Sequence, residues 1–408
     1  MNKQKVLLQI GAACNCGAPG KIAEQIGVLA MDNGWDVYMA HGHRHANDSQ
    51  LKSIEMVTPT LEKIHALYSI LLDKHGLGPN GKTSELVEWI KTKQPDIIHI
   101  HNLHGHFINY KTLFEFLSTV DIPIVWTFHD FWPITGHCVY FDNIGCQQWM
   151  TGCIKCPQNR SYPQTILYHR TSKNYNLKKK LFTGIQRMTI VPVSQWAGTL
   201  LQKSFLCNYP IHPIYNGLDT TVFRPRVSNL RKRLGIEAKT VLLGVASPWS
   251  ARKGYSLYFK LRERLPDEFA IIMVGVNDKE QAELPTGIIG IPQTHNQIEL
   301  AEYYSIADIV LNLSTQETFG MTTIEGMACG SPVIVMNKSA SPELVTPATG
   351  IIAETGDINN IIQAIFTIKH NGKDFYSKNC RLRVLNMFDK DKCFQEYIKL
   401  YNQLLIQA

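Results

Sequence analysis

The sequence lacks any apolar run long enough to cross a membrane, and it lacks low-complexity tracts. A membrane-spanning helix needs roughly 18 consecutive apolar residues. The start leads directly into the short apolar run Val6–Ile10, without the apolar core and small-residue cleavage site of a signal peptide. The sequence therefore predicts an intracellular, cytoplasmic protein.

A strong excess of one charge is also missing: 41 Lys and Arg residues face 34 Asp and Glu residues, a formal charge of +7. The basic residues are dispersed except at Lys178–Lys180 and Arg231–Arg233, so no nucleic-acid partner is expected. The run Asn176–Phe182 mixes lysines with apolar residues. A solvated helix face is the favoured interpretation, and peripheral contact with the inner face of the cell membrane is the alternative.

The length of 408 residues and the 44% hydrophobic content exceed what one hydrophobic core usually holds, which predicts two domains. Short β-rich runs alternate with helix-length segments in two series. The first series is Val6–Ile10, Val37–Ala40, Ile97–His101, Ile124–Phe128 and Met188–Val193. The second series is Val241–Val245, Ile271–Val274, Ile288–Ile291, Ile309–Leu313 and Val333–Met336.

This alternation predicts an α/β fold of two doubly wound, Rossmann-like domains. We expect an N-terminal, acceptor-side domain over residues 1–210 and a C-terminal, donor-side domain over residues 211–384. A C-terminal helix over 385–408 is expected to pack back near the first domain. Ligands of such sheets bind at the carboxyl ends of the strands, so the cleft between the domains is the expected binding site.

The most specific motif follows the predicted strand 309–313 and runs from Glu317 to Glu325. Gly320 permits a tight turn, and the N–H groups at the start of the next helix would face a diphosphate. These N–H groups belong to Phe319, Gly320, Met321 and Thr322. Glu317 and Glu325 flank this anion site, where a carboxylate needs neutral hydroxyl donors such as those of sugar and ribose rings. An ordinary acidic helix entry is the alternative.

The motif and its continuation to Ile334 resemble the two-glutamate signature of the retaining family 4 glycosyltransferases. In that family the first glutamate contacts the transferred sugar and the second contacts the ribose, which implies these roles for Glu317 and Glu325. The resemblance also implies the GT-B fold, in which two Rossmann-like domains face a central cleft.

The same resemblance implies a hexosyltransferase-like activity with a nucleotide diphosphate sugar as donor, of uridine or guanosine. Catalysis is then expected to need no cofactor and to proceed by front-face attack, with the leaving phosphate helping to take the acceptor proton. A glycan or lipid-linked acceptor in bacterial surface polysaccharide biosynthesis is the expected partner.

Two cations follow the predicted strand 241–245, Arg252 and Lys253, with Gly254 after them. Cations at a strand end can neutralise the charge that grows on a diphosphate leaving group. The family usually has an arginine soon after this strand, where this chain has Pro248. Arg252 is expected to substitute for that arginine, with an exposed surface position as the alternative.

His129 directly follows the predicted strand 124–128, and the family similarly has a histidine there, near the donor sugar. We expect His129 to form hydrogen bonds around the reacting carbon and to handle protons. Asn216 lies in a stretch that resembles the interdomain segment of the family and is expected to line the cleft. Gly17 and Gly20, in the loop after the first strand, are expected to face the donor phosphates or the acceptor. Simple turns are the alternative for these last three residues.

Histidines are concentrated in two short stretches. The first contains His99, His101, His104 and His106. Polar lining on the acceptor side is favoured for this stretch over a metal site, with His99 and His101 on one face of a strand. The second contains His41, His43 and His45, and an exposed loop is expected there.

Four of the ten cysteines are clustered. They are Cys138, Cys146, Cys153 and Cys156. The last two have the spacing that places two thiolates on one zinc ion, and the other two would complete a tetrahedral, structural site. Buried free thiols and disulfides are the alternatives.

Three other functions remain open from the sequence. The GT-B fold also supports phosphorylases and nucleotide-sugar epimerases. A sugar-nucleotide or polysaccharide binding protein with a decayed site is the alternative outside enzymes. The presence of Glu317, Glu325, Lys253 and His129 together argues against decay.

Overall fold

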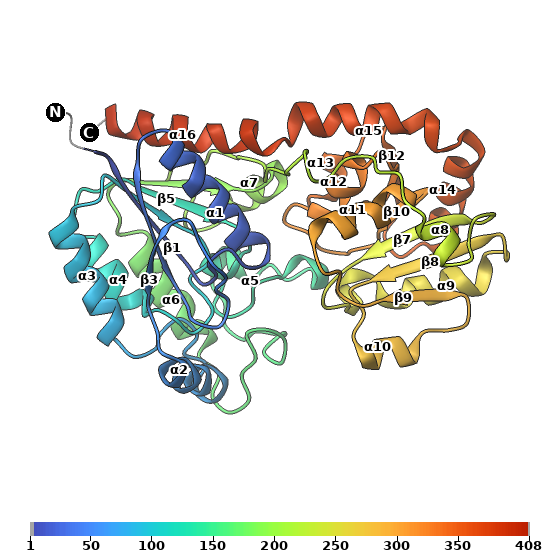
Figure 1. Ribbon diagram of the computed structural model, residues 1–408. Helices are drawn as coiled ribbons and strands as arrows, with labels where there is room; N and C mark the ends of the chain where they lie inside the picture. Colours follow the sequence, from blue (N-terminus) through green and yellow to red (C-terminus); the bar gives the residue numbers. More distant parts are fainter. Residues whose placement is uncertain (1–3, 407–408) are drawn as a thin grey trace. The chain divides into compact units, whose positions relative to one another are not determined.

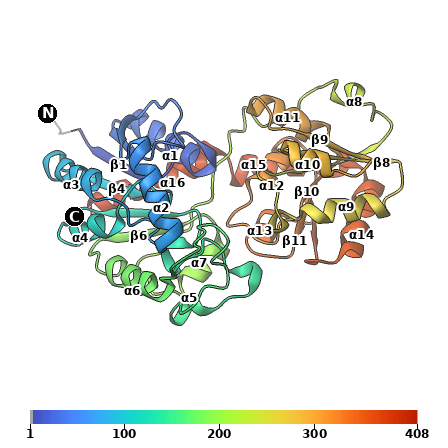
Figure 2. The ribbon, with the colours of Figure 1, turned by 90° about the horizontal axis from the view of Figure 1, so that it is seen from below.

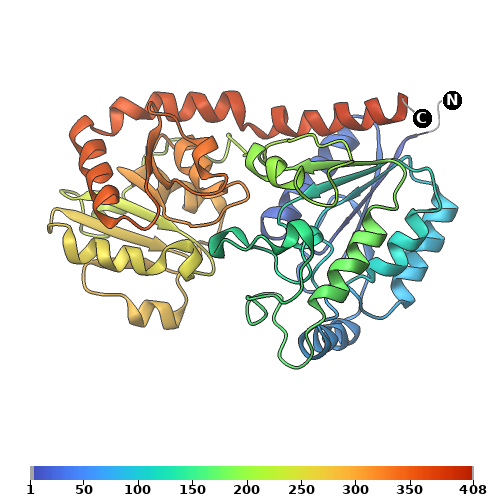
Figure 3. The same ribbon diagram turned by 180° about the vertical axis from the view of Figure 1, so that it is seen from behind.

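The computed structural model describes residues 4–406, which form two compact units. The first unit contains the chain up to Tyr215 and again from Phe394, and the second contains Asn216–Cys393. The sequence predicted the corresponding boundaries at 210/211 and 384/385. Within the described residues, no helix is long and apolar enough to span a membrane. Each unit is described by itself (Figures 1 to 3).

The first unit has one sheet of six parallel strands. Its strands are β1 (Val6–Gly11), β2 (Asp36–His41), β3 (Lys52–Glu55), β4 (Ile97–Ile100), β5 (Ile124–Phe128) and β6 (Met188–Pro192). Its helices are α1 (Gly17–Asp32), α2 (Pro59–Leu72), α3 (Gly81–Lys93), α4 (Tyr110–Leu117), α5 (Gln148–Thr151), α6 (Thr171–Phe182) and α7 (Gln195–Leu201). The last helix, α16 (Lys390–Ile406), begins in the second unit and continues in the first.

The second unit also has six parallel strands. Its strands are β7 (Thr240–Val245), β8 (Phe269–Val274), β9 (Ile288–Ile291), β10 (Ile309–Asn312), β11 (Val333–Met336) and β12 (Gly350–Ala353). Its helices are α8 (Leu230–Arg233), α9 (Tyr255–Arg264), α10 (Asp278–Glu283), α11 (Gln297–Ile306), α12 (Met321–Ala328), α13 (Ser341–Leu344), α14 (Ile358–Asn371) and α15 (Lys373–Met387).

Both sheets have the doubly wound strand order that the alternation predicted. The orders are β3-β2-β1-β4-β5-β6 and β12-β11-β10-β7-β8-β9. The winding direction therefore reverses between β1 and β4 in the first unit and between β7 and β10 in the second. Ligands of open α/β sheets bind beyond the carboxyl ends of the strands at this reversal.

Residues of β5 and β4 bind different helices on the two faces of the first sheet, because successive side chains in a strand alternate. On one face Trp126 contacts Phe114 of α4 and Phe182 of α6, with ring centroids 5.3 and 4.9 Å apart. On the other face α16 contributes two buried tyrosines. The Tyr397 hydroxyl lies 3.0 Å from that of Thr127, and the Tyr401 hydroxyl lies 2.7 Å from Nδ1 of His99.

Helix α6 has the solvated face that was expected for Asn176–Phe182 only in part, because Asn176, Lys179 and Lys180 are exposed but Lys178 is not. Lys178 is 1% exposed, and Leu181 and Phe182 are also buried in the core. The Lys178 ammonium donates hydrogen bonds to the carbonyls of Trp132 and Thr135 at 2.7 and 3.1 Å. The membrane-contact alternative is not supported for this run, because its apolar side chains pack against the protein.

Candidate functional site

The second unit brings together two charged residues of the sequence motifs at the point where the winding reverses. Lys253 ends the 3-10 turn Ala251–Lys253 after β7, and Glu317 lies in the loop after β10. Their side chains form an ion pair of 2.5 Å and are 21% and 12% exposed. Burial opposes ionisation of Glu317, but the adjacent Lys253 outweighs it and lowers the pKa of this carboxyl. The Glu317 carboxylate is thus ionised, and both side chains are within reach of solvent.

The two loops that carry this pair are joined directly. Arg252 donates from Nη1 to the carbonyl of Gln316 at 2.9 Å, and the N–H of Thr315 donates to the carbonyl of Arg252 at 2.9 Å. Gly254 follows with a φ of +74°, and a Cβ atom there would lie 2.6 Å from the carbonyl oxygen of Leu313. Only glycine fits this close approach, which explains why it follows Lys253.

Helix α12 starts immediately after the loop of Glu317. Its N-cap residue Gly320 has a φ of +112°, and no side chain caps this terminus. Met321 and Thr322 are half-buried in the first turn. Phe319 is 2% exposed and its ring packs against Phe388, so its side chain belongs to the core. Main-chain N–H groups therefore form the polar surface of this helix start.

Glu325 lies one turn further along α12 and is held by a second helix. Its Oε2 accepts a hydrogen bond of 2.7 Å from the hydroxyl of Tyr304 in α11. Burial, followed by the adjacent carboxylate, raises the pKa of Tyr304 well above its usual value, so this hydroxyl remains a donor. The carboxylate is therefore oriented before any ligand arrives.

The segment that begins at Asn216 is tied to the start of α16. Asn216 is 6% exposed. Two residues later, the N–H of Leu218 donates to the carbonyl of Phe388 at 2.8 Å, and Asp219 pairs with Lys390 at 2.6 Å. Burial opposes ionisation of Asp219, but Lys390 outweighs it and lowers the pKa to about 2. This segment is a fixed part of the second unit.

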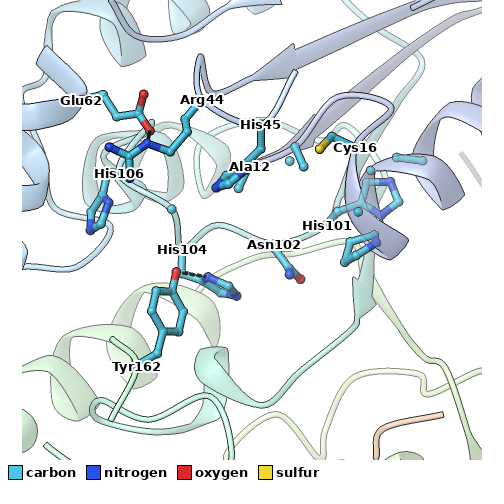
Figure 4. A pocket seen from close by; sticks show the side chains of 17 residues that line it. Ala12, Cys16, Arg44, His45, Glu62, His101, Asn102, His104, His106 and Tyr162 are labelled. Atoms are coloured by element: carbon cyan, nitrogen blue, oxygen red, sulfur yellow. Dashed lines mark hydrogen bonds and ion pairs between the residues drawn. The ribbon is translucent and has the colours of Figure 1, made fainter. Parts of the chain in front are cut away.

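The first unit has a cavity of about 310 Å³ at its own reversal, between the loops after β1 and β4. Gly17 and Gly20, at the start of α1, line this cavity. The N-cap residue Cys16 makes no side-chain capping bond, so the N–H groups of α1 face the cavity uncapped. Figure 4 shows its polar lining, which comprises Arg44, His45, Glu62, His101, Asn102, His104, His106 and Tyr162.

Two pairs of an acidic and a basic side chain lie in or beside this lining. Arg44 lies 3.9 Å from Glu62, with the arginine 62% and the glutamate 9% exposed. Nε2 of His104 lies 2.6 Å from Asp130, and Nδ1 lies 3.0 Å from the hydroxyl of Tyr162. Burial opposes ionisation of Asp130, but His104 outweighs it and lowers the pKa of this carboxyl. The cavity therefore offers both donors and acceptors, which suits a ligand with many hydroxyl groups.

His129 is part of a chain of hydrogen bonds that starts at a buried glutamine. Nε2 of His129 lies 3.1 Å from Nδ1 of His101, whose Nε2 lies 2.9 Å from Oε1 of Gln9. The amide nitrogen of Gln9 donates to the carbonyl of Ala23 at 2.9 Å, which fixes the orientation of the amide. Burial lowers the pKa of His101 well below its usual value and that of His129 to about 4. Both imidazoles are neutral at pH 7.

This chain sets the tautomer of each ring. Oε1 of Gln9 can only accept, so Nε2 of His101 carries the proton and Nδ1 of His101 is an acceptor. Nε2 of His129 must then donate to Nδ1 of His101. The basic lone pair of His129 is therefore on Nδ1. Gln9 and His101 thus act as positioning residues for His129.

The two histidine stretches divide between the cavity, the core and the surface. His101, His104 and His106 line the cavity, whereas His99 is fully buried and bonds to Thr127 at 2.8 Å. The prediction of a cavity-lining role is wrong for His99, because α16 covers it. In the second stretch His43 and His45 are exposed, as predicted, whereas His41 is buried, with Nε2 2.6 Å from the hydroxyl of Ser53.

The four clustered cysteines line one small cavity of the first unit as free thiols. A hydrogen bond from the thiol of Cys138 lowers the pKa of Cys156 to about 6, and the same contact raises the pKa of Cys138. Among the residues that the structure describes, no group of three or more His, Cys, Asp or Glu side chains is arranged to hold a metal ion. The zinc prediction is therefore not supported among these residues.

Several residues of the cavity were not singled out from the sequence. They are Arg44, Glu62, Asn102 and Tyr162, together with Gln9 behind it. Gln9 could have been recognised from the sequence, because it is a lone amide inside the apolar run Val6–Ile10 and a buried amide needs hydrogen-bond partners. Arg44, Glu62 and Tyr162 come from separate loops and helices, and no local pattern relates them.

Two protein families match this chain. The family described as Glycosyltransferase Family 4 matches residues 31–222, and the family described as Glycosyl transferases group 1 matches residues 227–381. The first match falls mainly in the first unit and the second match in the second unit. Together they include most of the chain.

Curated relatives agree with these families. A putative colanic acid biosynthesis glycosyl transferase of Escherichia coli K12 is 40% identical over 89 residues, 20% of this chain and 22% of the relative. N-acetyl-alpha-D-glucosaminyl L-malate synthase of Bacillus anthracis is 27% identical over 223 residues, 48% of this chain and 55% of the relative. The matched stretches thus span 22% and 55% of these two relatives. An uncharacterized 41.2 kDa protein in the cps region of Klebsiella pneumoniae is 27% identical over 330 residues, 78% of this chain and 81% of the relative.

Solved structures share the fold over the whole length. Sucrose-phosphate synthase of Thermosynechococcus elongatus has a TM-score of 0.74 at 18% identity, covering 99% of this chain and 100% of that one. Anabaena Alr3699/HepE in complex with UDP has a TM-score of 0.69 at 16% identity, covering 98% and 100%. The two parallel sheets, the two families and these neighbours agree, and the chain therefore belongs to the glycosyltransferases with the GT-B fold.

Proposed function

We propose that this chain is a retaining glycosyltransferase of family 4 in bacterial surface polysaccharide biosynthesis. It would transfer a sugar from a uridine or guanosine diphosphate sugar to a glycan or lipid-linked acceptor. The observation that carries the proposal is the ion pair of Lys253 and Glu317, 2.5 Å apart beside the uncapped start of α12. The printed names of two relatives, in colanic acid biosynthesis and in a cps region, support the biosynthetic context.

Cleavage of the bond between the sugar and the diphosphate leaves negative charge on the leaving group, which the proposed site neutralises. The Lys253 ammonium has three N–H donors and uses one on Glu317, so the others can bind phosphate oxygens. Arg252 and the N–H groups of Gly320, Met321 and Thr322 would add to this stabilisation. The anion site thus acts on the leaving group.

The two glutamates would then hold the neutral parts of the donor. Glu317 would accept hydrogen bonds from the hydroxyls of the transferred sugar and Glu325 from those of the ribose. His129, with its lone pair on Nδ1, would accept a hydrogen bond from the transferred sugar near the reacting carbon. We infer that the acceptor binds in the cavity that contains Gly17, Gly20 and His104, and that Asn216 supports the donor site.

A thermal-shift experiment separates the roles of the charged pair. The nucleoside diphosphate alone should raise the melting temperature of the wild type and of Glu317→Gln, and should raise that of Lys253→Met much less, because of the two paired residues only the lysine would bind phosphate. The nucleotide sugar should raise it further in the wild type only. Glu263→Gln and Lys260→Met, on exposed positions of α9, are matched controls. An unchanged diphosphate shift in Lys253→Met would contradict the assignment.

Transfer itself is measured as nucleotide release in an extract that contains acceptor. Glu317→Gln should lower the rate by about 100-fold or more, because it weakens a contact made at the reacting sugar. The anomeric configuration of the product, determined by NMR, tests retention. Conversion of the nucleotide sugar without any acceptor would instead identify an epimerase.

A further inference from the structure

Helix α2 is amphipathic in the reverse sense of a surface helix in a soluble protein. Its buried residues are the polar side chains Glu62, His65 and Ser69. Four large outward side chains are apolar: Ile64, Leu67, Tyr68 and Ile70 are 37, 52, 40 and 38% exposed. Figure 2 shows α2 on the near side of the first unit. A surface helix normally places its apolar side against the protein, so this outward side is suited to another apolar phase.

A second segment extends the apolar surface of α2. The N–H groups of Ile166 and Tyr168 donate to the carbonyls of Ile70 and Leu71 at 2.9 and 3.0 Å, so the segment lies along the end of the helix. Its side chains are still more exposed, with Ile166 at 59%, Leu167 at 62% and Tyr168 at 61%. We call the combined surface the apolar face; it consists of Ile64, Leu67, Tyr68, Ile70, Ile166, Leu167 and Tyr168. Contiguous exposed apolar side chains of this number mark an interaction surface.

The exposed charges along the two segments of the apolar face are of one sign. The sequence from 157 to 177, which includes Ile166–Tyr168, contains no Asp or Glu, and its charged residues are Arg160, Arg170 and Lys173. In α2 and the residue after it, the two acidic side chains, Glu62 and Asp73, are both buried. Lys63 is exposed on α2, and Lys74 lies over the ring of Tyr68 at 5.9 Å. The surroundings of the apolar face are therefore cationic.

We propose that the apolar face binds the surface of an anionic lipid bilayer. Aliphatic and tyrosine side chains would enter the boundary between headgroups and acyl chains, while Lys63 and Lys74 would contact anionic headgroups. A protein partner is the alternative occupant, and it would need an acidic surface that is complementary in shape. The apolar face has no feature that would recognise a particular shape, which favours the bilayer.

Helix α2 contributes to both the apolar face and the lining of the cavity. Glu62, on the inner side of α2, lines the cavity together with Tyr162, four residues before Ile166. A lipid-linked acceptor could place its sugar in this cavity while its lipid remained in the adjacent bilayer. This last step rests on the proposed function, whereas binding to the bilayer does not.

Sedimentation with lipid vesicles tests the proposal without donor or acceptor, so that its failure is separate from failure of the transfer assay. The full chain should bind vesicles of phosphatidylglycerol and phosphatidylethanolamine and should bind phosphatidylcholine vesicles much more weakly. Leu67→Ser/Leu167→Ser should lower the partition coefficient about tenfold, because two apolar anchors are lost. Lys63→Glu/Lys74→Glu should also lower it and should remove its dependence on salt.

The matched control is Val227→Ser/Phe375→Ser, which changes apolar side chains that are 105 and 62% exposed in the second unit. It should bind vesicles as the wild type does. Equal binding by the Leu67→Ser/Leu167→Ser variant, or no preference for anionic vesicles, would overturn the proposal. A wild-type dimer that this variant converts to a monomer would also overturn it, because a second copy would then cover the face. Melting temperatures near that of the wild type are expected for all variants, since the changed side chains are exposed.

Discussion

At the scale of single residues, the tautomer of His129 is determined by a residue that it does not contact. The ring itself is neutral through burial, but the position of its proton follows from an amide two hydrogen bonds away. A tautomer preference of this kind cannot be seen in the motif around His129. It becomes visible only when Gln9, His101 and His129, which lie on three strands or their ends, are brought together.

Gln9→Leu tests this dependence. Loss of the acceptor at Oε1 should allow His101 to exchange tautomers, so that Nε2 of His129 no longer has a fixed acceptor. We expect about a tenfold loss of kcat, with an unchanged thermal shift by the nucleoside diphosphate. In ¹H–¹⁵N spectra of labelled histidine, His129 should change from one tautomer to a mixture.

Gln9→Glu is the conservative control, because it retains an oxygen acceptor for His101. It should restore the single tautomer of His129. If Gln9→Leu kept that tautomer and still lost activity, the role of Gln9 would be structural packing alone.

At the scale of elements, α6 shows that sequence periodicity does not predict which lysine of a helix is buried. The run Asn176–Phe182 is rich in lysine, and a helix was predicted from it, but its lysines do not share one environment. Lys179 and Lys180 are exposed, whereas Lys178 is buried against Trp132, with its ammonium 3.3 Å from the ring centroid. The acceptors of Lys178 lie more than 40 residues away in sequence, so local pattern could not identify the buried member.

The burial of Lys178 makes stability depend on pH in a defined direction. Burial lowers the pKa of this lysine from 10.5 to about 7. Between these values the unfolded chain binds one more proton than the folded chain, so stability should rise with pH. The slope for one proton is at most about 1.4 kcal/mol per pH unit. Lys178→Met should remove this slope, and Lys179→Met should retain it, in urea unfolding at about pH 7 and about pH 9.

The strands were the most predictable elements. All ten apolar runs of the two series form strands, with ends within two residues of the predicted ones. The two missed strands, β3 and β12, each lie at one edge of a sheet, whereas the strands at the opposite edges, β6 and β9, were predicted. β3 reads Lys-Ser-Ile-Glu and is largely exposed, so it lacks the apolar run by which the predicted strands were found. Its existence depends on pairing with β2, which no local pattern encodes.

At the scale of the whole molecule, the chain passes between the two units twice, at 215/216 and again inside α16 at 393/394. The second passage returns the chain to the first unit. There Tyr397 and Tyr401 are 1% and 0% exposed and bond to Thr127 and His99. The first unit therefore includes, as part of its core, residues that are distant in sequence.

Tyr397→Ala should destabilise the first unit by about 3–5 kcal/mol, the usual cost of truncating a buried aromatic side chain. Tyr401→Phe should cost about 1–3 kcal/mol, because it removes only the hydroxyl that pairs with His99. Urea unfolding followed by hydrogen exchange would assign the loss to a unit. Equal protection of β4 and β5 in the wild type and in Tyr397→Ala would contradict this view of α16.

Because α16 returns to the first unit, it also sets the order in which the two units can fold during translation. A ribosome releases all of Asn216–Cys393 before it releases Tyr397 and Tyr401. The second unit can thus complete its fold on the nascent chain. One face of the sheet in the first unit stays uncovered until the end of α16 is released. N-terminal domains usually finish first during translation. Here we expect the N-terminal one to finish last and to be the one that needs protection by chaperones.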